Sequence, residues 1–215
     1  MKSKIMFAAA ISLSLSLSSN AQDMEVKITP DLESVEVTHD GEKVSIMRNQ
    51  DTENTISQSF SKTSRPCPPF CIQPMSLAPG VETIGEVEML DYLAKVEAGD
   101  DSVIVIDSRT PDWFERGTIP GAMNLPWTAL NPAKGADPLS IAEIMQDVFS
   151  VTESEGLFDY SNAKTAVMFC NGMWCGQSPN NIQNMLKFGY PAHKIKWYRG
   201  GMQDWEILGL TTVKP

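Results

Sequence analysis

The sequence predicts an α/β fold with a central parallel sheet, helices on both of its faces, and a small N-terminal β-hairpin extension. Two observations carry this prediction. From about residue 81 onward, short apolar runs rich in β-branched residues alternate with segments of helical periodicity, which is the order of elements in covered parallel sheets. Before that point, residues 35–46 hold two alternating runs around an Asp-Gly pair, which is typical of a hairpin.

The composition is that of a folded globular protein. The chain has 215 residues, of which 42% are hydrophobic and 20% are charged, so it can bury a core. Its formal net charge is -10, and it shows no cluster of Lys and Arg of the kind that binds phosphates. We therefore expect no nucleic-acid partner. Four cysteines are too few for a fold that depends on many disulfides.

The first 21 residues are predicted to be a cleaved signal peptide. Lys2 and Lys4 form a short positive region, residues 5–17 are apolar, and residues 19–21 (Ser-Asn-Ala) fit a small-x-small cleavage site. The apolar run is too short to span a bilayer, and no later segment is predicted to cross a membrane. We expect a periplasmic or secreted protein, in a compartment where disulfides form.

Residues 22–80 are predicted to be an N-terminal extension with three parts. The hairpin comes first, and residues 48–64 follow as a loop without periodicity. Residues 65–74 (RPCPPFCIQP) then form a segment that we call the connector, which its four prolines make stiff and extended. Because an isolated hairpin is only marginally stable, we expect the hairpin to pack on the rest of the chain or stay mobile.

Residues 81–215 are predicted to form the main domain. The apolar runs predict strands at residues 103–106, 122–125, 165–169 and 195–198. The 3.6-residue periodicity, with Pro at the starts and Gly near the ends, predicts helices at residues 87–98, 111–116, 138–148, 179–188 and 202–208.

The most informative segment joins the strand at 165–169 to the next helix. Cys170 comes at the carboxyl end of this strand, where α/β sheets bind ligands, and Ser178 and Pro179 are the predicted N-cap and first residue of the helix. Gly172 and Gly176 allow the backbone N–H groups of the loop to turn inward as an anion cradle. Those groups and the helix dipole favour a thiolate, so Cys170 is a predicted nucleophile that needs no histidine base.

Three stretches of the chain resemble the rhodanese family of sulfurtransferases. Residues 105–126 (VIDSRTPDWFERGTIPGAMNLP) are similar to its Asp-x-Arg start and the Gly-His-Ile-Pro-Gly-Ala that follows. Residues 167–178 resemble its strand and active-site loop, and residues 198–205 (YRGGMQDW) resemble its closing Gly-Gly-x-x-x-Trp. The resemblance covers about residues 81–212 and implies the three-layer rhodanese-like fold, in an exported member with an N-terminal extension.

The resemblance also implies a chemistry. Cys170 matches the family's catalytic cysteine, which takes sulfane sulfur as a persulfide and passes it to a thiophilic acceptor. The implied partners are a small sulfur-containing anion such as thiosulfate and a thiol acceptor, which can be a protein thiol, with no cofactor and no metal. Asp107 and Arg109 match the Asp-x-Arg pair and, with Trp205, are expected to support the structure. The substrate-binding cradle would comprise Asn171, Gly172, Met173, Trp174, Gly176, Gln177 and Ser178.

The active-site segment departs from the family pattern. The loop is longer than in common single-domain members and lacks the Arg that usually precedes the helix Ser or Thr. Arg199, at the end of the last strand, is therefore the candidate for supplying charge from outside the loop. Longer loops in this fold resemble those of phosphatases and arsenate reductases, which clamp a dianion with a loop Arg, so phosphatase activity is not expected. Thr118 stands where the family usually has His.

The four cysteines form two pairs whose roles the sequence leaves open. Cys175 can resolve a persulfide or mixed disulfide on Cys170, form an ordinary disulfide with it, or only pack. Cys67 and Cys71 in the connector are expected to form a structural disulfide or to cross-link the connector to the domain. A thiol relay that feeds Cys170 and a metal site built from all four thiolates are the alternatives, although the spacings differ from those of zinc motifs.

Three functions follow from these observations. The first is an exported sulfurtransferase that works through a Cys170 persulfide. The second is a thiol–disulfide redox protein that uses Cys170 and Cys175. The third is a non-catalytic rhodanese-like module that binds a partner through its N-terminal extension.

Overall fold

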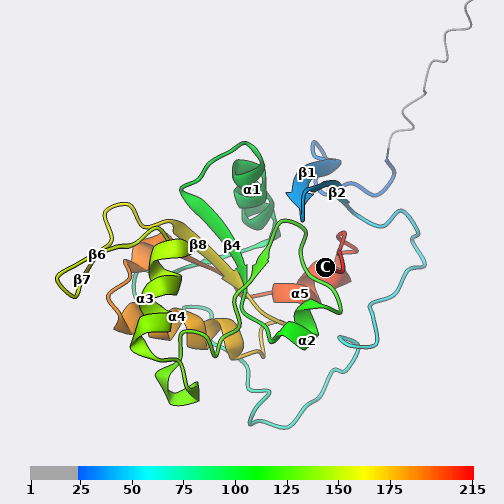
Figure 1. Ribbon diagram of the computed structural model, residues 1–215. Coiled ribbons are helices and arrows are strands. Elements are labelled where there is room, and N and C mark those ends of the chain that lie inside the picture. The colour runs from blue at the N-terminus through cyan, green and yellow to red at the C-terminus, as the bar shows by residue number, and fades with distance from the viewer. Residues whose placement is uncertain (1–23) are drawn as a thin grey trace, which may run out of the picture.

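Five parallel strands organise the fold in the computed structural model, which describes residues 24–215 (Figure 1). The predicted signal peptide, residues 1–21, lies outside these residues. All neighbouring strands of the sheet run parallel. Their order across the sheet is β3 (Glu82–Ile84), β9 (Ile195–Tyr198), β8 (Thr165–Phe169), β4 (Val103–Asp107) and β5 (Met123–Asn124). The predicted α/β class with a parallel sheet is confirmed.

Two apolar layers cover the sheet because successive side chains of a strand point to opposite faces. Val105 and Val167 pack on the face covered by α1 (Glu86–Glu97) and α5 (Gly201–Ile207). The residues next in sequence, Ile106 and Met168, pack on the other face. That face is covered by α3 (Pro138–Asp147) and α4 (Gln177–Lys187), which lie together on one side in Figure 1. Burial on both faces explains why these strands are apolar without alternation.

The N-terminal hairpin is present and belongs to the core. Strands β1 (Ser34–His39) and β2 (Glu42–Met47) pair antiparallel around Asp40 and Gly41, both of which have positive φ. Val37 and Ile46 are 2% and 0% exposed and pack in the same apolar layer as α1. At the far end of β2, the backbone N–H of Thr211 donates to the Met47 carbonyl, and the Met47 N–H donates to the Thr211 hydroxyl oxygen. The hairpin therefore packs on the main domain.

The elements differ from the prediction mainly at their ends. Strand β5 is shorter than predicted, since only Ile106 and Asp107 of β4 pair with it. The predicted helix at 111–116 is shortened to α2 (Pro111–Phe114). The sequence does not predict the edge strand β3 or an antiparallel hairpin, because three-residue strands have too few positions to show a period. The missed hairpin consists of β6 (Thr152–Ser154) and β7 (Leu157–Asp159), and two 3-10 turns lie at η1 (Pro132–Lys134) and η2 (Ala192–Lys194).

Residues 49–64 contain turns and irregular backbone, as the lack of periodicity predicts. They run along the outside of the domain and lead into the connector (Figure 1). Between residues 24 and 215, the chain has no helix with both the length and the apolarity needed to cross a bilayer.

We expect Ile46→Ala to lower the free energy of unfolding of the whole chain by about 2–5 kcal/mol, because the substitution leaves a cavity in the shared core. Urea denaturation followed by tryptophan fluorescence measures this change. Glu36→Ala, on the exposed face of the paired strand, is the control and should change stability by less than about 0.5 kcal/mol. An equally small effect of Ile46→Ala would show that the hairpin is not part of the cooperative unit.

Candidate active site

Cys170 lies where the sequence predicts it, directly after β8 and at the start of a loop that leads into α4. Cys170 and Cys175 are free thiols and are only 2% and 5% exposed. The predicted N-cap is wrong by two residues: α4 begins at Gln177 with Gly176 at the N-cap, and the Ser178 side chain caps no backbone group. The Ser178 hydroxyl is turned instead toward the sulfur of Cys170.

A buried hydrogen-bond chain ends on this sulfur. The Ser178 hydroxyl donates to Cys170 Sγ at 3.1 Å, and the Trp197 indole Nε1 donates to Ser178 Oγ at 3.1 Å. Because the indole N–H occupies an acceptor site of the hydroxyl, the hydroxyl proton is directed at the sulfur. Sequence reasoning missed Trp197, whose position in a buried strand marks it only as a core residue.

The surroundings of Cys170 stabilise its thiolate. Burial by itself raises the pKa of this thiol, because it removes the charged form from water. Hydrogen bonds from the Cys175 thiol, the Ser178 hydroxyl and the backbone N–H groups of Ser178 and Gly172 act in the opposite sense. They outweigh burial and lower the pKa of Cys170 from 9.0 to about 7. All of these donors are neutral.

Cys175 has the opposite character. Burial raises its pKa well above the ordinary value, and the neighbouring Cys170 sulfur raises it further. Cys175 therefore remains a protonated thiol that donates toward Cys170. Its sulfur also lies 3.7 Å from the side-chain oxygen of Gln177. The surroundings therefore shift the pKa values of the two loop cysteines in opposite directions, and the lowered pKa favours the thiolate at Cys170.

The start of α5 holds the loop from behind. The backbone N–H of Met202 donates to the Cys170 carbonyl and that of Gln203 donates to the Asn171 carbonyl, each at 3.0 Å. Gly201 makes this approach possible: its φ is +57°, and a Cβ there would collide with the Cys170 carbonyl oxygen. Gly201 of the closing Gly-Gly motif therefore allows α5 to bind the peptide that follows Cys170.

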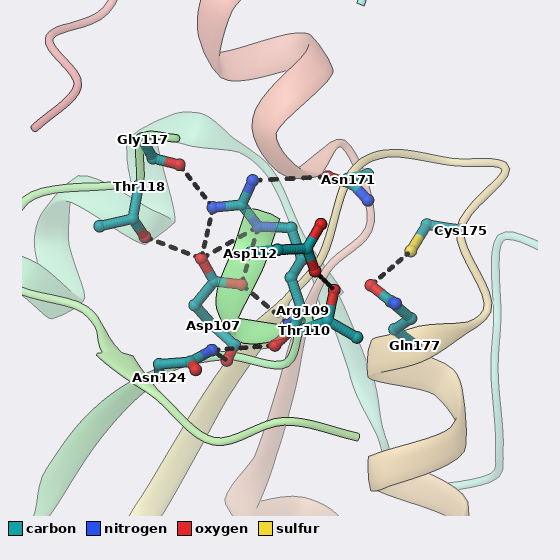
Figure 2. A network of polar contacts seen from close by, with 10 residues as sticks. All are labelled: Asp107, Arg109, Thr110, Asp112, Gly117, Thr118, Asn124, Asn171, Cys175 and Gln177. Atoms are coloured by element: carbon teal, nitrogen blue, oxygen red, sulfur yellow. Dashed lines mark hydrogen bonds and ion pairs between the residues drawn. The ribbon is translucent and has the colours of Figure 1, made fainter. Parts of the chain in front are cut away.

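A buried ion pair holds the loop from the side, as Figure 2 shows. Arg109 donates from Nη2 to Asp107 Oδ2 at 2.6 Å and from Nε to Asp107 Oδ1 at 2.9 Å. Nη2 also donates to the Gly117 carbonyl at 2.6 Å, and Nη1 donates to Asn171 Oδ1 at 3.4 Å. The Thr118 hydroxyl donates to Asp107 at 2.8 Å. The pair contacts the loop at Asn171, which is the geometry of structural support.

Three of the other predicted site residues, Met173, Trp174 and Arg199, contact the connector, and the fourth, Trp205, lies in the core. Met173 and Trp174 lie against the connector, with Met173 O accepting from Gln73 N at 2.8 Å. Arg199 does not donate to the loop: its guanidinium donates to the carbonyl oxygens of Gln73 and Pro74 in the connector. Trp205 is fully buried, and its indole donates to the Thr211 carbonyl at 2.8 Å.

The second cysteine pair is joined: Cys67 and Cys71 form a disulfide within the connector. This is one of the two disulfide arrangements expected from the sequence, and it leaves no thiolates here for a four-cysteine metal site. Among residues 24–215, no group of three or more His, Cys, Asp or Glu side chains is arranged to hold a metal ion.

Comparison with known proteins gives a family match. The family model of the Rhodanese-like domain matches residues 90–208, more than half of the chain. A curated relative, the HTH-type transcriptional regulator Rv0324 of Mycobacterium tuberculosis, is 25% identical over 120 residues, which are 56% of this chain. The chain spans only 41% of the length of that regulator.

Two sulfurtransferases are among the similar solved structures. The human single-domain sulfurtransferase TSTD1 is 20% identical, and the match covers 59% of this chain and 96% of that one with a TM-score of 0.38. The thiosulfate sulfurtransferase of Pseudomonas aeruginosa is 16% identical, with 62% of this chain and 20% of that one covered and a TM-score of 0.41.

We expect Gly201→Ala to destabilise the protein by about 1–3 kcal/mol beyond the cost of the backbone conformation alone, because the new methyl group overpacks the Cys170 carbonyl. Gly135→Ala is the matched control, since Gly135 also has positive φ but meets no atom within 4 Å. Chemical denaturation of both variants gives the difference. An equal decrease in the free energy of unfolding in the two variants would contradict the role assigned to Gly201.

We expect Ser178→Ala to raise the pKa of Cys170, because the thiolate loses its buried hydroxyl donor. The rate of Cys170 alkylation by iodoacetamide, followed against pH by peptide mass spectrometry, should shift its midpoint upward by about one pH unit. Trp197→Phe keeps the hydroxyl and removes only the group that orients it, so its shift should be smaller. An unchanged midpoint in Ser178→Ala would count against the hydrogen-bond chain.

Proposed function

The chain belongs to the rhodanese-like domain family, and from this premise we propose that it is an exported sulfurtransferase that carries sulfane sulfur as a persulfide on Cys170. One observation supports the proposal above the others: a cysteine at the end of a parallel strand has its pKa lowered to about 7 by inward-facing donors. Near neutral pH a large fraction of this sulfur is therefore thiolate, which is the reactive form.

The proposed reaction has two displacements. In the first, the Cys170 thiolate attacks the outer sulfur of a donor such as thiosulfate; the sulfur–sulfur bond of the donor breaks, and sulfite leaves with the bonding pair. The product is a Cys170 persulfide. In the second, a thiophilic acceptor such as a small or protein thiolate attacks the terminal sulfur, and Cys170 leaves as a thiolate. No net oxidation of the protein occurs, and Cys170 returns to its starting state.

Neutral groups of the loop would hold the charge through both steps. The Ser178 hydroxyl and the N–H groups of Gly172 and Ser178 that stabilise the thiolate are placed to stabilise a persulfide anion. Residues 170–178 contain no Lys or Arg, and the nearby Arg109 is bound to Asp107. A site without a cationic clamp is suited to a soft sulfur anion better than to a phosphate dianion.

Export is supported by the predicted signal peptide and by the Cys67–Cys71 disulfide, because such bonds persist in oxidising compartments. The proposed location is the periplasm or the extracellular space.

A second candidate function is thiol–disulfide exchange, and the split in character between the two loop cysteines favours it. The pKa of Cys170 is lowered and that of the neighbouring Cys175 is raised. In such a pair, the low-pKa thiolate of Cys170 would form a mixed disulfide with a substrate, and Cys175 would then resolve it. This activity needs both sulfurs, whereas sulfur transfer needs only Cys170.

We expect the protein, first reduced with a thiol and freed of the reductant, to gain the mass of one sulfur atom on Cys170 when mixed with thiosulfate. It should then release thiocyanate when cyanide is added. Cys170→Ser should lower thiocyanate release at least about 10³-fold, because the nucleophile is removed. Peptide mass spectrometry and colorimetric detection of thiocyanate measure the two steps.

The control is Leu139→Ala, which changes an exposed side chain on α3 and should match the unmodified protein. Cys175→Ser separates the candidates: it should still load sulfur on Cys170 but lose any turnover of glutathione disulfide. Failure to load Cys170, together with disulfide turnover that both substitutions abolish, would favour the redox function. Absence of both activities would favour a non-catalytic binding module.

A further inference from the structure

The connector lies across the rim of the Cys170 loop. The backbone N–H of Gln73 donates to the Met173 carbonyl at 2.8 Å, and the Gln73 side-chain nitrogen lies 3.9 Å from the position of a Cβ at Gly176. Arg199 fixes this crossing by donating from Nη2 to the Gln73 carbonyl at 2.8 Å and from Nε to the Pro74 carbonyl at 3.2 Å. The connector is therefore hydrogen-bonded to the loop at Met173 and passes close to Gly176.

An aromatic and cationic cluster forms a further contact. The Phe70 ring meets the Trp174 ring edge-on at 5.4 Å, and the Arg65 guanidinium stacks 4.4 Å from Trp174 and 4.8 Å from Phe70. Trp174 is held in turn by Gln203, which accepts from its indole at 2.6 Å. Each contact of this type is weak by itself, so the attachment of the connector to the loop depends on their acting together.

The Cys67–Cys71 disulfide constrains the segment that carries both Arg65 and Phe70. Arg65 precedes the disulfide by two residues and Phe70 lies inside the ring that it closes, with the Cα atoms of the two cysteines 4.7 Å apart. The bond thus keeps the guanidinium and the phenyl ring together on Trp174. Once it is broken, Arg65 and Phe70 are linked only by the intervening chain, and the conformational cost of placing both on Trp174 rises.

The disulfide is open to solvent, whereas the Cys170 sulfur is buried. Cys67 is exposed and Cys71 half-buried, and both line a cleft of about 770 Å³ whose other wall includes Met173 and Trp174 of the loop. Cys170, the predicted nucleophile, is 2% exposed. An external thiol can therefore reach the disulfide, whereas Cys170 is buried beneath a loop whose rim the connector holds at Met173 and Trp174. Exposed disulfides are also the ones that thiols reduce readily.

We propose that the Cys67–Cys71 disulfide is a reaction site for an external dithiol, and that its reduction releases the connector and uncovers Cys170. One thiolate of the dithiol attacks Cys67 Sγ, the protein S–S bond breaks, and Cys71 leaves as a thiolate. The second thiolate of the dithiol then attacks its own partner sulfur in the mixed disulfide, and Cys67 leaves as a thiolate. Two electrons pass to the protein, the dithiol departs as a disulfide, and its two protons go to Cys67 and Cys71.

The rate of Cys170 alkylation by iodoacetamide tests this proposal, measured by peptide mass spectrometry on the full mature chain. The rate is compared between the disulfide form and the same protein reduced with a small dithiol such as dithiothreitol, which is then removed. We expect at least a tenfold increase on reduction and a return to the slow rate after reoxidation. An unchanged rate, with Cys67 and Cys71 shown to be alkylated as free thiols, would overturn the proposal.

Variants make the test independent of the reductant. The double variant Cys67→Ser/Cys71→Ser should react rapidly at Cys170 without reduction, and Phe70→Ala, which keeps the disulfide, should be intermediate. Met75→Ala changes a 70% exposed side chain in the segment that follows the connector and should match the unmodified protein. If the double variant does not fold, as circular dichroism would show, the comparison of the two redox forms still decides.

The result does not depend on sulfur transfer, because alkylation reports only the exposure and ionisation of Cys170. A redox-dependent alkylation rate in a protein that forms no persulfide would support this proposal while contradicting the proposed function. A persulfide that forms equally fast in both redox forms would do the reverse.

Discussion

The structure depends on one constraint: the pKa of a buried thiol, Cys170, is lowered by hydrogen bonds from neutral donors. Taking Cys170 out of water opposes ionisation, so the compensation must come from several neutral hydrogen bonds that all point at one sulfur. Hydrogen bonds from neutral donors are weaker than those from charged donors, and their strength falls steeply when they are misaligned. The backbone that carries these donors must therefore be fixed. Most of the contacts around the loop serve this requirement.

Three parts of the chain far apart in sequence fix that backbone. Helix α5 binds the loop carbonyls from behind through the close approach that Gly201 permits, and the Asp107–Arg109 pair reaches Asn171 from the end of β4. The connector binds Met173 and Trp174 from outside. The N-terminal extension is therefore part of the environment of the site, which gives residues 60–74 a physical role that the sequence alone did not suggest.

The fold and the position of Cys170 at the end of a strand were accessible from sequence because they rest on local patterns. Apolar runs such as residues 103–106 and 165–169 identify the buried strands, and a cysteine followed by spaced glycines at a strand end identifies the loop. The contacts of Trp197 and Gln203 with the loop, and the capture of Arg199 by the connector, depend on which side chains meet in space. Neither the hydrophobic periodicity nor the spacing of motifs in the sequence indicates these tertiary contacts. The Ser178 cap failed for a similar reason, because the nearby sulfur competes with the helix for its hydroxyl.

The central claim is that neutral donors hold the Cys170 thiolate. It is tested most directly by the ultraviolet absorbance of the thiolate, titrated against pH as the difference between the unmodified protein and Cys170→Ser, at about 0.05 M and about 1 M salt. Neutral donors predict a pKa near 7 that is the same at both salt concentrations, because screening acts on charges and not on buried dipoles. A pKa near the ordinary value of 9.0, or one that rises at high salt, would contradict the account.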